Sequence, residues 1–539
     1  NSISSFGGNI KIAGDGAATT RGIVTYGNTI NINAGSGEIE LDGQVTSTAI
    51  GNRGGILFGL HDLSIVSRVN ISSSATSGDA ITINGVGRGT EDAIGLSGTL
   101  NITSSGGGNI VMNGNALGSG RSIVVGNYYH GILNIFANSG NISLNGNTKA
   151  VQVAAAFTNG LIFGPSKINI GQGGTITSSS SDVFITADNI ALAAGGIAIN
   201  ASGKVTIEPA SNSFASAITF PITNLSIANT ITGLTLGKPT NNQNITFGSA
   251  TSIAGPITAY GGTITLNADL TTTNNGDISL YTDNALGGLG VARTINASGS
   301  FNYIPRSDFF NAPVTYPISN LNLTSSGLLI GKPTNTADIT FANATSIAGP
   351  ITAYSGTITL DANLTTTNNG DISIHTDYPI AGLGTPRTLT AAGAFNYIPR
   401  TTTFSADVTY PIANLTATAT GLTIGNLTND KNITINADVT GGAGIELYGN
   451  NVNINANLKT TGTSAIMHLK GNTTIAAGKT ITSGGNFTHD GNLTFKSDVN
   501  GTAAFGTLGG TFTTVSGLAT TERYVPSKRG WRLLTAPLK

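Results

Sequence analysis

The sequence predicts an all-β protein, a β-solenoid that we expect to be a right-handed parallel β-helix. Three observations lead to this fold class: a long internal repeat, alternation of polar and apolar residues within each copy, and short loops rich in Gly and Asn. Residues 251–282 (TSIAGPITAYGGTITLNADLTTTNNGDISLYT) return almost unchanged at residues 345–376, a shift of 94 residues. Strand, turn and strand repeated in tandem, with no helical stretch between them, are typical of stacked solenoids.

Each copy contains strands in which one side faces a core. The tetrapeptide TITL at residues 263–266 alternates polar and apolar residues, the period of a half-buried strand. Its first apolar residue, Ile264, recurs as Ile358 and, in a fainter third copy, as Val452. We therefore expect these three side chains to point inward and to stack in one column.

The loops between strands carry turn signals. Asn275-Gly276 recurs as Asn369-Gly370, and we expect both pairs at equivalent corners with Gly at a positive φ. Solenoid coils of about 20 residues would divide a 94-residue repeat into four or five coils.

Composition excludes several classes of protein. The 539 residues include 74 Gly and only 9% charged residues, against about 25% in ordinary globular domains. There is no Cys, and so no disulfide or thiolate metal site; a net charge of −1 provides no global field for nucleic acid. No apolar run approaches the roughly 18 residues of a membrane-spanning helix. We expect no cofactor and no metal.

The repeats suggest a division of the chain. We expect irregular coils at 1–204, long repeats at 205–298, 299–392 and 393–487 (the last degenerate), terminal coils at 488–518, and a basic segment at 519–539. In the first of these parts the phrase Asn-Ile-x-apolar begins at four asparagines: Asn9, Asn109, Asn141 and Asn189. These asparagines could stack as a hydrogen-bonded ladder, or they could serve the turns alone.

Two segments carry a resemblance to known families. Phrases such as NITINA at 432–437 resemble the right-handed parallel β-helix of filamentous-haemagglutinin-type surface proteins. The tail ERYVPSKRGWRLL at 522–534 resembles a segment that follows repeat arrays in large secreted surface proteins of the Bacteroidota, gliding-motility adhesins among them. The resemblance implies export by the type IX secretion system, although its C-terminal sorting domain is not seen in the sequence.

The tail also contrasts with the repeats in composition. It holds the only Trp, Trp531, and five basic residues: Arg523, Lys528, Arg529, Arg532 and Lys539. An open solenoid end needs a cap, so Trp531 and Leu533 could cover the last coil. We expect instead that the tail leads into a further domain, with its basic residues facing that domain or the export machinery.

Metal sites have little support in the sequence. No two of the histidines lie within four positions of each other: His61, His130, His375, His468 and His489. The segment GGAGIE at 441–446 faintly resembles a calcium-binding repeat but occurs once. The recurring loop acids Asp277 and Asp371 could ligate calcium with neighbouring Asn oxygens, or could be solvated turn residues.

Binding sites are suggested by aromatic residues that recur with Pro and Arg. Aromatic side chains beside Arg on a surface suit a sugar or a protein partner, although such residues also staple loops onto coils. The candidate ligand-binding residues are Phe301, Tyr303, Arg306, Phe395, Tyr397 and Arg400.

The predicted function is structural or adhesive. We expect a segment of an extracellular bacterial surface protein that displays surface for a carbohydrate or cell-surface ligand, with no catalysis. The alternative is a β-helical polysaccharide lyase or hydrolase, which would need clustered carboxylates or an acid and a base on one exposed face. Ice binding by Thr rows is a weaker alternative, because the Thr rows give way to Asn in the third copy. A calcium-binding solenoid is a weaker alternative as well, since its repeat motif occurs only once.

Overall fold

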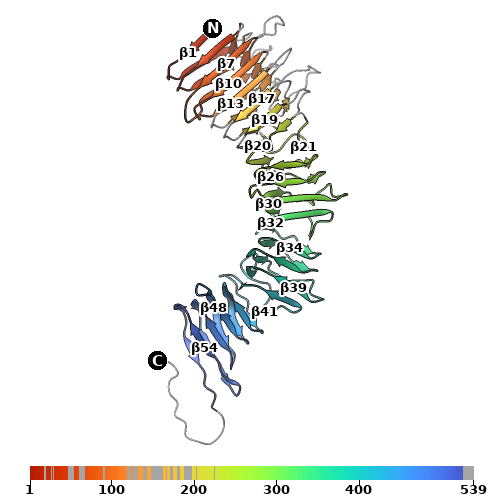
Figure 1. The fold of residues 1–539 in the computed structure, drawn as a ribbon, viewed down its shortest axis with the longest axis vertical. Coiled ribbons are helices and arrows are strands. Elements are labelled where there is room, and N and C mark those ends of the chain that lie inside the picture. Colours follow the sequence, from red (N-terminus) through yellow and green to blue (C-terminus); the bar gives the residue numbers. More distant parts are fainter. Residues whose placement is uncertain are drawn as a thin grey trace. The chain divides into compact units, whose positions relative to one another are not determined.

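The structure is a computed structural model in which the described residues form strands and loops only. Described residues run from 1 to 525, with gaps at 17–19, 26, 28, 47–53, 60–66, 89–91, 97, 118–122, 126–131, 138–141, 147–161, 165–166, 170–173, 179–182, 187, 189–196, 202, 210 and 224. The chain divides into two compact units, Asn1–Ser300 and Phe301–Lys539. Each unit is a stack of coils whose strands pair in parallel with those of the next coil (Figure 1). The predicted all-β solenoid is confirmed.

In the N-terminal part of the first unit, each coil contributes one strand to each of three ladders. The first ladder is β1 (Ser2–Ser4), β4 (Thr29–Asn33), β7 (Arg68–Ser73), β10 (Thr99–Ser104), β13 (Ile132–Ala137), β17 (Gly174–Ser178), β19 (Ile197–Ala201) and β22 (Leu225–Ile227). The second is β2 (Ile10–Gly16), β5 (Ile39–Val45), β8 (Ile81–Gly87), β11 (Ile110–Ala116), β14 (Ile142–Gly146), β18 (Val183–Thr186), β20 (Lys204–Glu208), β23 (Gly233–Leu236), β26 (Ile257–Tyr260) and β29 (Ile278–Tyr281).

The other ladders of the first unit are shorter. The third ladder is β3 (Ile23–Thr25), β6 (Ile56–Phe58), β9 (Ile94–Leu96), β12 (Ile123–Val125) and, antiparallel, β15 (Ile162–Gly164) and β16 (Lys167–Asn169). Two short ladders follow, β21 (Ile218–Phe220) with β24 (Ile245–Phe247) and β27 (Ile264–Leu266), and β25 (Thr251–Ile253) with β28 (Leu270–Thr272) and β30 (Arg293–Ile304).

The second unit has one long ladder and several shorter ones. The long ladder is β32 (Leu321–Ile330), β35 (Ile351–Tyr354), β38 (Ile372–His375), β40 (Ala394–Ile398), β43 (Gly421–Ile424), β46 (Gly444–Ile454), β48 (Ile466–Ile475), β50 (Asn486–Asp490) and β55 (Phe512–Ser516). The shorter ladders are β31 (Val314–Tyr316), β33 (Ile339–Phe341) and β36 (Ile358–Leu360); β34 (Thr345–Ile347), β37 (Leu364–Thr366), β39 (Arg387–Thr390) and β42 (Leu415–Thr418); and β45 (Val439–Gly441), β47 (Leu458–Thr460), β49 (Thr480–Ser483) and β54 (Ala504–Leu508).

Four remaining strands extend the ladders of β46 and β48, and two form a hairpin. These strands are β41 (Val408–Tyr410) with β44 (Ile433–Ile435) before β46, β51 (Leu493–Phe495) with β56 (Ala519–Thr521) after β48, and the antiparallel pair β52 (Ser497–Asp498) and β53 (Gly501–Thr502).

The register shows how the 94-residue repeat divides into coils. Successive partners along the long ladder are Leu328, Ile351, Ile372, Phe395 and Leu422. Leu422 lies one full repeat after Leu328, so the repeat spans four coils, within the expected range. Coils of the first unit differ more in length, since one runs from Ile10 to Ile39 and the next from Ile39 to Ile81.

The predicted core residues are buried. Ile264, Ile358 and Val452 are each 0% exposed. Ile264 continues the ladder of β21 and β24, Ile358 that of β31 and β33, and Val452 that of β41 and β44. The inward placement of all three side chains is confirmed, and each copy of the repeat builds its own short apolar column; a single column shared by the three copies stays a prediction.

Burial of Ile358 yields a first prediction. Ile358→Asp would place an unpaired carboxylate in the core and should lower the free energy of unfolding by about 3 kcal/mol or more. Thr359→Asn is the matched control, because the neighbouring Thr359 alternates to the outer side of the same strand and should change stability little. Urea unfolding followed by circular dichroism measures both, and equal effects of the two changes would contradict the register.

The Asn-Gly corners are equivalent, but their backbone differs from the expectation. Asn275 and Asn369 have φ of 58° and 61°, preceded by two further asparagines with positive φ, whereas neither Gly276 nor Gly370 has a positive φ. The glycines are required for another reason: a Cβ on Gly370 would lie 2.4 Å from the carbonyl oxygen of Gly349 in the preceding coil. The Asn supplies the left-handed turn and the Gly allows the coils to approach closely.

This division of roles gives a second prediction. Gly370→Ala should destabilise the protein by about 1 to 3 kcal/mol, because the added methyl group overlaps the backbone of the preceding coil. Asn369→Gly should cost less, since Gly adopts the left-handed conformation readily. The denaturation midpoints of the two variants should differ in that order; the reverse order would show that the corner is limited by its dihedral angles.

Polar side chains connect each coil to the next. A ladder of asparagines does occur, although at positions inside the first ladder and away from the expected phrases: Asn70 Nδ2 donates to Asn31 Oδ1 and Asn101 Nδ2 to Asn70 Oδ1, each at 2.7 Å. Of the expected asparagines, Asn9 instead accepts from the backbone of Glu38 and Asn109 donates to the carboxylate of Asp79. Asn141 and Asn189 lie outside the described residues.

A second, deeper asparagine recurs once in each long repeat. Asn241, Asn335 and Asn429 are 0%, 0% and 6% exposed. Asn335 Oδ1 accepts from the N–H of Phe310 in the preceding coil at 3.1 Å, and its Nδ2 donates to the carbonyl of Tyr354 in the following coil at 2.7 Å. The same two bonds recur at the other two asparagines. Each buried amide thus joins three coils.

The C-terminal coil is the least covered of the described part. The strands β55 and β56 pair on one side only, with β50 and β51, and Val515 and Leu518 are 63% and 76% exposed. Trp531 and Leu533, the predicted cap residues, lie outside the described residues, as do the basic residues from Lys528 onward. Of the basic cluster only Arg523 is described, and it is exposed.

Candidate functional site

The aromatic residues predicted to bind a ligand lie in the core. Phe301 and Tyr303 on β30, and Phe395 and Tyr397 on β40, are between 0% and 3% exposed. They occupy the inward positions of alternating strands, where the burial pattern of β40 is intermediate, buried, intermediate, buried, intermediate. The prediction that these rings are exposed is therefore wrong. Side chains two positions apart in a strand face the same side, so Phe301 and Tyr303 both point into the core, as do Phe395 and Tyr397.

These rings instead hold loops against the coils, the other role considered for them. The ring of Tyr397 packs against Phe404 with centroids 4.7 Å apart, and Tyr303 packs against Phe310 at the same distance. Phe404 and Phe310 belong to the loops that follow each strand and are themselves almost fully buried. The hydroxyl of Tyr397 donates to the carbonyl of Tyr378 at 3.1 Å, so the ring is fixed at both ends. Burial raises the pKa of Tyr397, which remains a neutral donor.

Arg400 serves the same corner. Its guanidinium contacts the carboxylate of Asp377 at 3.3 Å and donates to the carbonyl of Pro333 at 3.0 Å. The side chains of Arg400 and Asp377 are 12% and 16% exposed. Asp377 also accepts from the N–H of Thr401 at 2.8 Å. Since these groups pair within the corner, they bind the loop to the coil, and Arg306, the equivalent residue one repeat earlier, is half-buried as well.

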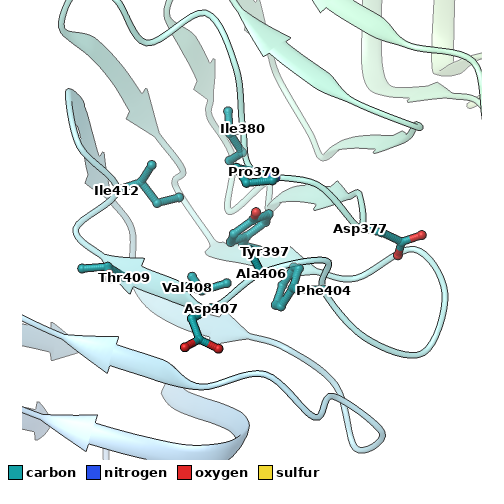
Figure 2. A pocket seen from close by; sticks show the side chains of 10 residues that line it. All are labelled: Asp377, Pro379, Ile380, Tyr397, Phe404, Ala406, Asp407, Val408, Thr409 and Ile412. Atoms are coloured by element: carbon teal, nitrogen blue, oxygen red, sulfur yellow. The ribbon is translucent and has the colours of Figure 1, made fainter.

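A small crevice of about 80 Å³ opens beside Tyr397 (Figure 2). Its walls are mainly apolar and come from the loop after β38 and the segment leading into and past β41, with the lining residues Asp377, Pro379, Ile380, Tyr397, Phe404, Ala406, Asp407, Val408, Thr409 and Ile412. In Figure 2 the carboxylates of Asp377 and Asp407 point away from the ring of Tyr397. Asp407 accepts from the N–H and the side-chain amide of Asn432, each at 2.9 Å. The crevice is therefore an apolar hollow, and the carboxylate of Asp407 at its edge is already hydrogen-bonded to Asn432.

The loop acids considered as calcium ligands are used between coils. Asp277 Oδ1 accepts from the N–H of Ser300 at 2.7 Å, and Asp371 Oδ1 accepts from that of Ala394 at 2.6 Å. Within the described part of the chain, no group of three or more His, Cys, Asp and Glu side chains could hold a metal ion. The same part contains no helix long and apolar enough to cross a membrane. Asp277 and Asp371 are thus turn residues with a defined structural role.

The side chains that do face outward were not singled out by the sequence analysis. On β26 and β29 the rings of Tyr260 and Tyr281 stack with centroids 4.4 Å apart, and one repeat later Tyr354 and His375 stack at 4.2 Å on the long ladder. Hydroxyl side chains lie two positions before them, at Thr258, Ser279, Thr352 and Ser373. Counting the position of each aromatic within its alternating strand would have separated these outward rings from the inward ones.

No family model, curated protein or solved structure matches the chain. The assignment of function therefore depends on the residues themselves, chiefly on the outward rows of hydroxyl and aromatic side chains that follow the stacked coils.

The burial of two histidines leads to a prediction of how the stability of the protein depends on pH. Burial against the neighbouring coil lowers the pKa of His375 to about 4, and burial also lowers that of His489, which is 2% exposed. Between pH 6.5 and 4 the unfolded chain binds a proton at His375 that the folded chain does not, so stability falls as pH falls through this window. The lowered pKa of His489 acts in the same direction. The expected loss at His375 is on the order of 1 to 2 kcal/mol.

A comparison of variants isolates this effect from the titration of carboxylates. His375→Phe retains a ring for stacking on Tyr354 and removes the proton site, so its denaturation midpoint should fall less between pH 7.5 and pH 4.5 than that of the unaltered chain. His61 and His130 lie outside the described residues. Parallel pH profiles for the variant and the unaltered chain would show that His375 does not contribute.

Proposed function

We propose that this chain is a structural and adhesive segment of an extracellular bacterial surface protein. The observation that carries the proposal is the regular outer face of the parallel coils, where hydroxyl, amide and aromatic side chains repeat in register from coil to coil. Successive coils place equivalent side chains about 4.8 Å apart. A surface with that regular spacing suits an extended ligand such as a polysaccharide, which presents repeated hydroxyl groups and sugar faces.

The use of the carboxylates supports a non-catalytic role. Asp269, Asp277, Asp338, Asp371 and Asp438 each accept a backbone N–H from the following coil. The pKa of Asp438 is held below its usual range by its hydrogen bonds to Asn457, beginning with the backbone bond. Carboxylates that accept these backbone hydrogen bonds stabilise the stack of coils. A glycosidase or lyase would need such groups free to face a substrate.

The cellular setting is inferred from the resemblance of the tail and the repeats to secreted adhesins of the Bacteroidota. On that basis the chain acts outside the cell, is exported by the type IX system and adjoins further domains of a surface protein. Its ligand is a carbohydrate or another component of a neighbouring surface, and a role in gliding motility belongs to the same proposal.

A two-part experiment tests the function. Antibodies against the chain should label intact cells of the source organism, because the segment is displayed outside; labelling that requires permeabilised cells would contradict the location. Beads that carry the full chain should adhere to glycan-coated surfaces more than beads that carry the heat-unfolded chain. Equal adhesion of the two bead types would leave a spacer role and overturn the adhesive one.

A further inference from the structure

At one place on its outer face, the third repeat carries ionisable side chains where the first two carry hydroxyl side chains. In the first two repeats the hydroxyl position two residues before the outward Tyr is Thr258 or Thr352, and its partner in the next coil is Ser279 or Ser373. In the third repeat these two positions are Glu446 and His468, which pair in register on β46 and β48. The outward Tyr is retained as Tyr448, and inward residues such as Ile445 and Leu447 remain fully buried.

The new side chains contact one another. The hydroxyl of Tyr448 donates to Glu446 Oε2 at 2.5 Å and lies 3.3 Å from His468 Nδ1. The imidazole of His468 meets the ring of Tyr448 edge-on, with centroids 5.1 Å apart. Lys470 is the register partner of Tyr448 and lies on the same outward side of β48. The four half-buried side chains form a cluster of acceptors, donors and two rings on two adjacent coils.

Backbone irregularity shapes this cluster. The register of β46 against β48 shifts between Tyr448 and Asn451, where β46 contains one residue more than its partner. Such bulges change the direction of neighbouring side chains and are frequent beside binding sites. On the other side of Tyr448, the preceding coil contributes Gly425, which has no side chain to cover the tyrosine ring.

We propose that Glu446, Tyr448, His468 and Lys470 form a binding subsite for a neutral saccharide chain. The subsite rests on the proposed adhesive function and specifies its location and ligand. The free oxygen of Glu446 accepts from sugar hydroxyls, Lys470 and the outer nitrogen of His468 contact further hydroxyls, and the ring of Tyr448 packs against a sugar face.

The charges of the region select the class of saccharide. Glu446 lies in this cluster, and Asp490 follows Lys470 in the same outward row as its register partner on β50. Two carboxylates and one ammonium group disfavour a polyuronate, whereas carboxylates are strong acceptors for neutral sugar hydroxyls. Burial, and secondly the hydrogen bond to Glu446, raise the pKa of Tyr448, so its hydroxyl remains protonated and holds Glu446 in place.

Replacement of the cluster by the residues of the second repeat provides a test. Glu446→Thr with His468→Ser restores side chains that the same fold already accommodates at Thr352 and Ser373. The full chain and this double variant are compared on an array of neutral glucans, mannans, galactans and xylans together with polyuronates, followed by calorimetry on the best neutral ligand. We expect at least a tenfold loss of affinity in the double variant.

Matched controls separate this subsite from the rest of the outer face. Asp361→Asn removes an exposed carboxylate at the corner after β36, outside the outward rows, and should leave affinity within twofold, whereas Tyr448→Phe should weaken binding. Circular dichroism verifies that each variant folds. Binding that is unchanged in the double variant overturns the subsite while leaving adhesion intact. A preference for polyuronates, or no glycan binding by a chain that still labels the cell surface, overturns it as well.

Discussion

Hydrogen bonding between successive coils is the constraint on which the rest of this structure depends. A parallel ladder satisfies the backbone within strands, but at every corner an N–H of one coil would lack a partner unless the preceding coil supplied one. Asp and Asn side chains at the corners fulfil this need: Asn244 accepts from Thr263, and Asp338 accepts from Thr357 one repeat later. Where the coils approach most closely, Gly255 and Gly349 leave no room for a Cβ. The low charge of the chain and its abundance of Gly and Asn both follow from this arrangement.

The fold could be predicted because its signal is local and repeated. Alternation in TITL and its copies placed Ile264, Ile358 and Val452 inside, and the repeat length gave the number of coils. Their ladders could not be predicted, because a coil of variable length changes which strand meets which. The corners show a similar limit: the Asn-Gly pairs were recognised as turns, but the residue with positive φ was misassigned. The need for Gly370 arises from the carbonyl of Gly349 in another coil, and a turn motif contains no information on that contact.

The candidate site was harder to predict, for a reason visible in the aromatic residues. Tyr397 and Tyr354 both lie in short alternating strands, yet one is 3% exposed and the other is half-buried and outward. The pairing of Tyr397 with Pro and Arg suggested a surface, whereas the partner that explains it, Phe404, comes from a loop that folds back over the ring. Proximity of Glu446 to His468 likewise depends on the register of β46 and β48. Residues 22 positions apart acquire a common environment only through that register.

The buried asparagines have a consequence for how damage spreads. In a stack where each coil contacts only its neighbours, loss of one coil costs the two interfaces beside it. Asn335 extends that reach, because its amide bonds to Phe310 on one side and to Tyr354 on the other. Detachment of either flanking coil leaves part of a fully buried amide without a partner, and the middle coil is weakened in turn. Three adjacent coils should therefore open together, so a protease that cuts one exposed loop would release fragments several coils long.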